Sequence, residues 1–347
     1  MSCVRLLKEI NLSNKKIVLT GITTSGVPHI GNLVGAVLPA IQSSKETDIS
    51  SFLFLADYHS LIKNQDPDLT YTSSFEVAAC WLACGLDPEK VIFYRQSDVP
   101  HIMELAWVLS CLTSKGLLNR AHAYKAATSV NQEQDVADVD KGVTMGLFNY
   151  PILMSADILM FNADEVPVGQ DQKQHIEMAR DIASRFNHHY GDIFTLPEAK
   201  ISDSGGVLPG TDGRKMSKSY GNVIPVFCEF NKIKKLVRKI KTNSLEPGVP
   251  KDADECTIFS IYQAFASQSD VDDMKKLYEN GISWGDAKDK LAELIDETIR
   301  PYRVEYQKLC EDRKYVGDIL KQGAKKASEV AEPMLEKVRR AVGIREF

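Results

Sequence analysis

The sequence lacks the features that mark a membrane or exported protein. No segment reaches the roughly 18 uninterrupted apolar residues that a membrane span needs. The most apolar stretch, GLFNYPILMSADILMF, is interrupted by Asn149 and Asp157. The segment 1–16, MSCVRLLKEINLSNKK, contains Glu9 and has neither a long apolar core nor a small-residue cleavage site. We therefore expect a cytoplasmic protein with no signal peptide, transit peptide or membrane contact.

A cysteine framework is also missing. The chain has 7 cysteines, and no two of them form a CxxC pair. Scattered thiols are typical of a reducing compartment. Cys80 and Cys84, four residues apart on an apolar helical pattern, leave a metal site open, but free cysteine most often behaves as a small buried apolar residue. We interpret all the cysteines in that way and expect no protein-bound metal.

The sequence has no internal repeats and no low-complexity segments, and its excess of acidic over basic residues is small. With 347 residues, of which 44% are hydrophobic and 26% charged, the chain is long enough for one large domain and a smaller one. Its net charge of -5 excludes a general attraction to nucleic acid. The segment 231–241, NKIKKLVRKIK, is the exception, because it is basic and amphipathic. It is either a solvated helix face or a phosphate contact.

Apolar runs alternate with helical patterns in the first part of the chain. Such alternation is typical of an α/β fold with a doubly wound parallel sheet, in which ligands bind beyond the carboxyl ends of the strands. Strands are predicted at 16–22, 52–57, 91–96 and 165–169, and helices at about 31–44, at about 70–85, from about 101, at 151–161 and from near Asp171.

The pattern changes twice further along the chain. A polar, acidic stretch at 119–145 is interpreted as an insertion or a mobile loop, inside a connective insertion of about 100–165. Strand signals almost vanish after about residue 225. The domains are therefore predicted as 1–224 and a helical unit 225–347, with helix breaks at EPGVPKD and near Pro301.

A glycine-rich turn follows the first predicted strand. In KKIVLTGITTSGVPHIGN, 15–32, an apolar run leads through Gly21, Gly26 and Gly31 into a new helical periodicity. A helix start behind such a turn is an anion site, because unpaired N–H groups and the helix dipole face the ligand. The lysine of a GxxxxGK[ST] loop and the GxGxxG spacing are both missing. A phosphate here needs a cation from elsewhere.

The segment GTDGRKMSKSYGN, 210–222, offers that cation. It presents Arg214, Lys215 and Lys218 on a glycine-rich loop. Lysines on a loop that moves can strengthen their contacts as charge develops in a transition state. That property suits adenylyl transfer, in which pyrophosphate leaves. The alternative is a surface loop with incidental lysines.

Together these segments carry a family resemblance. HIGN at 29–32 and KMSKS at 215–219 resemble the signature pair of class I aminoacyl-tRNA synthetases. The segment NYPILMSADILMFNADEVPVGQDQKQHIEMARDIASRFN, 149–187, and DYHSL, 57–61, are similar to bacterial-type tryptophanyl-tRNA synthetases, and the similarity spans the whole chain. It implies a Rossmann-like catalytic domain over 1–224, a helical anticodon-binding domain over 225–347, and a homodimer. The implied ligands are ATP, Mg²⁺, L-tryptophan and tRNA(Trp).

Asp157 stands out for a physical reason as well. In the predicted helix only Ser155 and Asp157 are polar. The helix therefore has no solvent-exposed polar face toward which this carboxylate could point. A buried acid without a partner is costly, so Asp157 either caps a local group or awaits a donor. The indole N–H of tryptophan is a donor-only group that would match it, and such a site rejects phenylalanine strongly.

The resemblance implies roles for further residues. The catalytic residues would be His29, Lys215 and Lys218. Tryptophan would be held by Gly21, His59, Tyr150, Met154, Asp157, Val166, Val168 and Gln172. ATP would be held by Thr23, Thr24, Ser25, Gly31, Asn32, Gly169, Gln170, Asp171, Val207, Lys215, Met216, Ser217, Lys218 and Ser219.

Some of these residues have a plainer interpretation. Met154 and Val166 would suit core packing equally well, and a lone histidine such as His29 is more often structural than a phosphate donor. Thr23 and Thr24 stand where many bacterial members have Gln-Pro, so packing around the adenine is expected to differ.

Three other functions remain open at this point. A tyrosyl-tRNA synthetase needs a pocket for a phenol hydroxyl, and Asp157 would accept a hydrogen bond from that group too. A non-catalytic synthetase-like RNA-binding protein would show decay in HIGN or KMSKS, and both are intact. A small-molecule adenylyltransferase of the same superfamily predicts no large helical C-terminal unit.

Overall fold

The fold is built on a parallel sheet. The structure is a computed structural model that describes residues 15–24, 26, 28–201 and 208–347. The strands pair in the order β3-β2-β1-β4-β5, and every neighbouring pair is parallel. This arrangement confirms the predicted doubly wound α/β fold. The strands are β1 (Lys16–Thr23), β2 (Ile49–Ala56), β3 (Ile92–Arg95), β4 (Glu165–Val168) and β5 (Glu198–Ile201).

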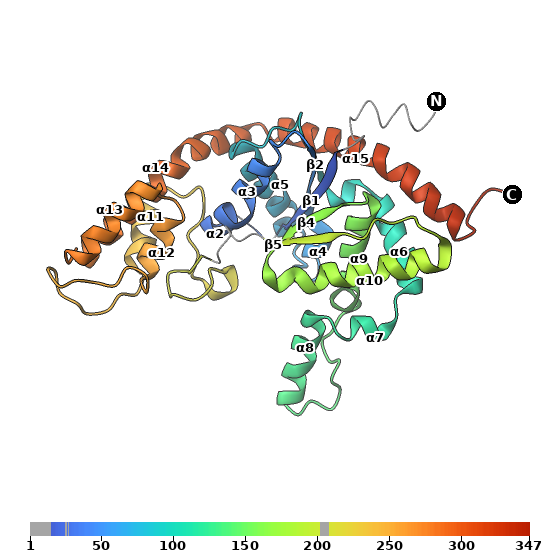
Figure 1. Ribbon diagram of the computed structural model, residues 1–347, viewed down its shortest axis with the longest axis horizontal. Helices are drawn as coiled ribbons and strands as arrows, with labels where there is room; N and C mark the ends of the chain where they lie inside the picture. Colours follow the sequence, from blue (N-terminus) through green and yellow to red (C-terminus); the bar gives the residue numbers. More distant parts are fainter. Residues whose placement is uncertain (1–14, 25, 27, 202–207) are drawn as a thin grey trace.

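Helices cover both faces of the sheet (Figure 1). Beyond residue 229, the described chain consists of helices and the loops that join them. The elements around the sheet are α2 (Ile30–Asn32), η1 (Leu33–Val37), α3 (Leu38–Ser43), α4 (Asp57–Ser60), α5 (Pro67–Ala83), η2 (Gln96–Asp98), α6 (His101–Leu112), α7 (Lys115–Leu118), α8 (His122–Glu133), α9 (Met145–Met160), η3 (Gln170–Gln172) and α10 (Lys173–Tyr190). Further along the chain lie η4 (Lys218–Tyr220), α11 (Phe230–Arg238), α12 (Thr257–Gln263), α13 (Gln268–Glu279), α14 (Trp284–Glu311) and α15 (Arg313–Ala341).

The apolar strands divide their side chains between two cores. On β2, Leu53 and Leu55 pack into a core with α5 and the helices α11 to α14. Phe52 and Phe54, from the opposite face, pack into a core with α6, α9, α10 and α15. Because successive side chains of a strand point to opposite faces, a continuous apolar run produces this burial on both sides.

The helix α15 packs against β3, the strand at one edge of the sheet. Gly323 lies so close to this strand that an ideal Cβ on it would be 1.7 Å from the carbonyl oxygen of Phe93. Ala324, Ala327 and Ala331 continue the contact as small buried residues. Small side chains at this face allow a helix to lie against backbone and cover an exposed strand edge.

We expect Gly323→Ala to lower the free energy of unfolding by about 3 kcal/mol, because the new methyl group overlaps backbone that cannot rotate away. Gly317, on the same helix, has no heavy atom within 4 Å of its Cβ position. The matched variant Gly317→Ala should therefore raise stability by about 0.5–1 kcal/mol through helix propensity. Urea unfolding of both variants tests the pair, and equal effects would contradict this packing.

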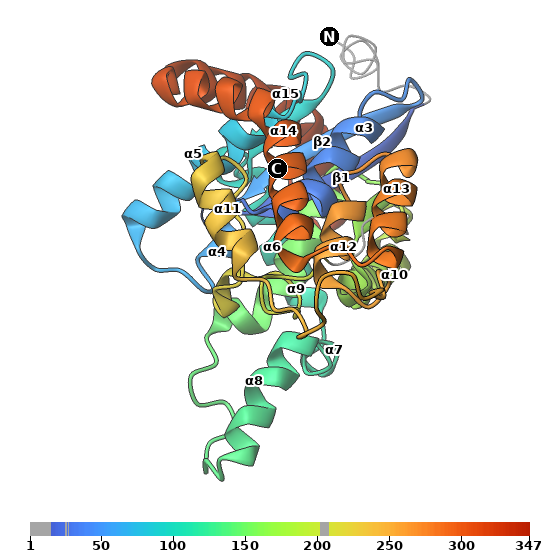
Figure 2. The same cartoon turned by 90° about the vertical axis from the view of Figure 1, so that its left-hand side faces the viewer.

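The stretch 119–145 differs from the sequence prediction. It was expected to be an insertion or a mobile loop, but it contains α8, which projects away from the sheet (Figure 2). No residue of α8 is buried, so the helix lacks the buried apolar face by which a helix is usually recognised. The loop after it folds back, because the side chain of Asn131 donates to the carbonyls of Val139 and Lys141 at 2.8 and 2.9 Å.

Two other expectations concern the helical region. The predicted break near Pro301 is wrong, since α14 continues through it. Proline removes one hydrogen bond and kinks a helix without always ending it. Most of the basic segment 231–241 forms α11, whose Lys234 and Arg238 pair with Asp289 on α14 at 3.3 and 2.5 Å. Part of its charge is therefore structural, and the rest is exposed.

The cysteines follow the prediction in most cases. Cys80, Cys84, Cys228 and Cys256 are buried as free thiols. Cys111 is exposed, so its interpretation as a buried residue is wrong; it lies on the outward face of α6. Across the described ranges, no helix combines the length and apolar character that crossing a membrane requires.

Candidate active site

A cavity of about 1160 Å³ lies at the carboxyl ends of β1, β2 and β4. Its position is the one expected for a ligand site in a doubly wound sheet. All eight residues that the family resemblance assigned to tryptophan line it. They are Gly21, His59, Tyr150, Met154, Asp157, Val166, Val168 and Gln172. Met154 and Val166, for which core packing was the plainer interpretation, therefore border the cavity.

Asp157 is the buried acid of this cavity. Its side chain is 1% exposed, and each carboxylate oxygen accepts a hydrogen bond. His59 Nε2 donates to one carboxylate oxygen at 2.9 Å, and Gln96 Nε2 donates to the other at 2.8 Å. Burial raises the pKa of Asp157, and these two donors oppose that rise. Since a carboxylate has about four lone-pair positions, it can accept a further N–H from a ligand.

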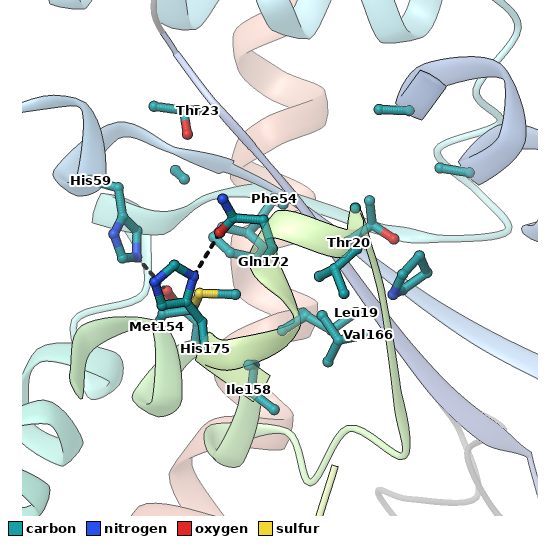
Figure 3. A pocket seen from close by; sticks show the side chains of 18 of the residues that line it. Leu19, Thr20, Thr23, Phe54, His59, Met154, Ile158, Val166, Gln172 and His175 are labelled. Carbon is teal, nitrogen blue, oxygen red and sulfur yellow. Dashed lines mark hydrogen bonds and ion pairs between the residues drawn. The ribbon is translucent and has the colours of Figure 1, made fainter. Parts of the chain in front are cut away.

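A second chain of hydrogen bonds joins Tyr150, His175 and Gln172. His175 Nδ1 donates to Gln172 Oε1 at 2.8 Å, as Figure 3 shows. The Tyr150 hydroxyl then donates to Nε2 of the same ring, which must be the neutral tautomer. Burial raises the pKa of Tyr150 to about 12, so its proton stays in place. These contacts fix the orientation of two side chains that line the cavity.

Gly21 shapes the wall of the cavity. It is paired in register with Phe54 on the neighbouring strand. An ideal Cβ on Gly21 would lie 2.5 Å from Cζ of the Phe54 ring. Only glycine therefore lets this aromatic ring lie across β1 beside the cavity (Figure 3).

The helix start after β1 provides fewer free amides than the sequence suggested. The Ile30 N–H donates to the carbonyl of Ile224 at 2.9 Å. His29 Nδ1 accepts from the Asn32 N–H at 3.3 Å, and the Asn32 side chain accepts from the His29 N–H in return. This capping box and the carbonyl of Ile224, just beyond the KMSKS loop of 210–222, satisfy donors that were expected to face a phosphate. The Nε2–H of His29 remains as a donor in the tautomer that this cap requires.

Burial, together with the smaller effect of the nearby Lys218, lowers the pKa of His29 to about 4. The imidazole is therefore neutral in the folded protein at neutral pH. In the unfolded chain, His29 binds a proton below its ordinary pKa of about 6.5. In the folded chain it binds that proton only below about pH 4. The free energy of unfolding should fall as the pH drops through this window.

The variant His29→Asn keeps a capping acceptor and removes this titration. Between pH 7 and pH 4.5 the wild type should lose about 2 kcal/mol more stability than the variant does. Urea unfolding at the two pH values measures the difference. Parallel losses in both proteins would show that His29 titrates normally.

The KMSKS loop lies against the glycine turn. An ideal Cβ on Gly26 would be 3.5 Å from Lys218 Nζ, and one on Gly31 would be 3.6 Å from Met216 Sδ. Asn222 organises the loop, since its side-chain oxygen accepts from the Ser217 N–H at 2.8 Å and its amide donates to the Lys215 carbonyl at 3.1 Å. Segments about 185 residues apart in the sequence thus meet at one helix start, as the lysine loop was predicted to do.

The remaining residues predicted to contact ATP are distributed around this point. Thr23 and Gly169 line the cavity, whereas Gln170 is exposed outside it. Thr24 is buried, and its hydroxyl lies 2.8 Å from that of Ser60 at the end of α4. Ser25, Val207 and the side chain of Asp171 lie outside the described residues. The ATP contacts of all these residues stay predictions.

Two residues of the site were missed in the sequence. Gln96 is completely buried and bonds both Asp157 and the Tyr58 N–H. It ends the third strand segment, VIFYRQ, so its place at a carboxyl strand end was a usable signal. His175 stands three residues after Gln172, a spacing that brings helical side chains together.

Comparison with known proteins agrees with this site. A family model described as "tRNA synthetases class I (W and Y)" matches residues 12–300. The match covers well over half of the chain. The chain therefore belongs to the class I tRNA synthetases of the tryptophan and tyrosine group.

Its relatives place it more narrowly. A "Tryptophan--tRNA ligase" of Neisseria meningitidis is 55% identical over 332 residues, which cover 96% of this chain and 99% of that protein. Another, of Xanthomonas axonopodis pv. citri, is 56% identical over 95% of this chain and 77% of its own length. Within the class, the chain belongs with the bacterial tryptophanyl-tRNA synthetases.

Solved structures give the same picture. Tryptophanyl-tRNA synthetase from Campylobacter jejuni, complexed with ADP and tryptophan, matches with a TM-score of 0.85 and 40% identity, over 94% of this chain and 99% of that one. The enzyme from Mycoplasma pneumoniae matches with a TM-score of 0.79 and 26% identity, over 95% of this chain and 98% of that one.

Proposed function

We infer that the chain activates L-tryptophan with ATP and transfers the tryptophanyl group to tRNA(Trp). The observation that carries this inference is the buried Asp157, which His59 and Gln96 hold in place at the cavity wall. A desolvated carboxylate beside a largely apolar cavity matches the indole ring and its single N–H donor. Tyr150, Gln172 and His59 would then orient the amino-acid end.

In the first step a carboxylate oxygen of tryptophan attacks the α-phosphorus of ATP. A new P–O bond forms, the bond to the β-phosphate bridge breaks, and pyrophosphate leaves with the electron pair. His29 Nε2–H and the ammonium groups of Lys215 and Lys218 would stabilise the charge that develops on the leaving group. Positioning and charge stabilisation supply the acceleration, and no side chain acts as a nucleophile.

The finer parts of this function are also proposals. Mg²⁺ would arrive with the nucleotide, held by its phosphate oxygens. The helical part over 225–347, with the exposed cations of α11, would contact tRNA(Trp). The enzyme would act as a cytoplasmic homodimer. In the second step the 3′-terminal adenosine of the tRNA takes the acyl group and releases AMP.

Charging of a bacterial tRNA(Trp) transcript with labelled tryptophan tests the complete reaction. We expect ATP-dependent attachment of tryptophan and none of tyrosine. A tRNA(Tyr) transcript with labelled tyrosine is the matched control. Charging of the control pair instead would assign the chain to the tyrosine branch of its family.

A further inference from the structure

Ser73, on α5, is a buried serine whose hydroxyl makes no hydrogen bond. The residue is completely buried, and across the described ranges its Oγ atom has no hydrogen-bond partner. A hydroxyl that leaves water on folding and gains no partner lowers the stability of the protein. Because most buried polar groups are paired, this exception needs an explanation.

The other buried helical serines of the described chain show the usual arrangement. Ser60, Ser74 and Ser155 each donate to the carbonyl four residues earlier, at 3.1, 3.0 and 2.7 Å. That bond is a common way for a serine inside a helix to satisfy its hydroxyl. Ser74 is the residue next to Ser73, so α5 permits the bond at the neighbouring position. The Ser73 hydroxyl does not form it.

The Ser73 hydroxyl lies instead beside Gly26, in the glycine turn that follows β1. An ideal Cβ on Gly26 would lie 3.9 Å from Ser73 Oγ and 3.5 Å from Lys218 Nζ, as its nearest described neighbours. Both separations are ordinary van der Waals contacts, so among the described residues this position has room for one heavy atom. Gly26 has φ +93°, a conformation that favours glycine. The backbone thus disfavours a side chain at this position.

Both side chains that border the position can donate to an anion. The Lys218 ammonium carries N–H donors only, and the Ser73 hydroxyl can donate one hydrogen bond. A phosphate oxygen placed between them would accept from both, and bonds to a charged oxygen are the stronger kind. Each donor atom would have to move by only about 1 Å to reach hydrogen-bond distance.

We propose that Ser73 binds the triphosphate of ATP, with its hydroxyl donating to an oxygen of the two outer phosphates beside Gly26. The proposal rests on the function inferred above and adds a residue outside HIGN and KMSKS to the ATP site. The outer phosphates are assigned because Lys218, at the same position, acts on the pyrophosphate that leaves. The unpaired hydroxyl is costly in the free protein, and the nucleotide supplies the missing acceptor.

Calorimetric titration with ATP and with AMP tests this contact. Ser73→Ala should weaken ATP binding by about 10-fold to 100-fold, the usual cost of losing one hydrogen bond to a charged group. AMP lacks the outer phosphates, so its affinity should not change. Equal losses for the two nucleotides, or full ATP affinity in the variant, would overturn the proposal.

Ser74→Ala is the matched control, because it removes a hydroxyl of the same helix that already has a partner. This variant should bind ATP like the wild type. Ser73→Ala should have the higher urea midpoint of the two variants, since it removes an unpaired hydroxyl while Ser74→Ala breaks a hydrogen bond. A lower midpoint for Ser73→Ala would show that the Ser73 hydroxyl is paired in the free protein, against the premise of the proposal.

Ser73→Cys separates the hydrogen bond from the volume of the side chain. A thiol fills a similar space but is a weak donor, so this variant should lose as much ATP affinity as Ser73→Ala. Retained affinity in Ser73→Cys would mean that packing, and not donation, is the role of Ser73.

Pyrophosphate exchange supplies the kinetic readout. In Ser73→Ala the KM for ATP should rise by about 10-fold or more, with the KM for tryptophan unchanged. An increase in the KM for tryptophan of the same size would contradict a role confined to ATP. Wild-type protein that performs no tryptophan-dependent exchange would refute the proposed function instead, and the ATP and AMP titrations would still decide whether Ser73 holds the outer phosphates.

Discussion

Replacing Asp157 with asparagine is expected to lower kcat/KM for tryptophan by about 100-fold or more and to leave the KM for ATP unchanged. The carboxylate accepts from His59 and Gln96 and has capacity for the indole N–H. An amide of the same shape offers one acceptor oxygen and one NH₂ group. That NH₂ must face a donor in a site without solvent, and a buried donor without an acceptor is costly.

Pyrophosphate exchange at varied tryptophan and ATP measures both constants. Asp57→Asn is a suitable control, because Asp57 is a second buried acid close by that accepts from Ser97 and does not line the cavity. It should change the KM for tryptophan far less. Equal losses in the two variants would mean that general disturbance, and not a missing acceptor, weakens tryptophan binding.

Lys218→Ala is expected to reduce the rate of adenylate formation by about 100-fold to 1000-fold, the usual cost of removing one group that stabilises transition-state charge. Its ammonium lies beside Gly26, at the glycine turn. Tryptophan affinity, measured by calorimetry without ATP, should stay unchanged because the lysine is outside the amino-acid cavity.

Lys239→Ala, at the C-terminal cap of α11, is the matched control for charge, since it removes an exposed lysine that does not line the cavity. Exchange does not involve tRNA, so this variant should retain the wild-type rate. A wild-type rate of adenylate formation in Lys218→Ala would show that this loop lysine takes no part in the reaction.

The sheet was predictable from the sequence because its strands are short apolar runs between helical patterns. β5 was missed, since EAKI is an edge strand with every second residue exposed and no apolar run. The helix after β1 was predicted as regular, but η1 interrupts it as a π-helix. Nothing in the local pattern of LVGAV signals that change, and π-bulges are frequent at functional sites.

The site was predictable where chemistry forces a choice of residue. Asp157 attracted attention because an acid in an apolar helix is costly, and the structure identifies its partners as His59 and Gln96. Those partners come from other strand ends, so the sequence alone could not supply them. The hydrogen bond from the Ile30 N–H to the Ile224 carbonyl is a similar case. Such contacts depend on tertiary packing and leave no local pattern.

The most direct test of the account is pyrophosphate exchange by the wild-type chain with tryptophan or tyrosine as the sole amino acid. We predict saturable exchange that requires both ATP and tryptophan, with no stimulation by tyrosine. Exchange that depends on tyrosine, or that proceeds equally without any amino acid, would contradict a tryptophan site at Asp157.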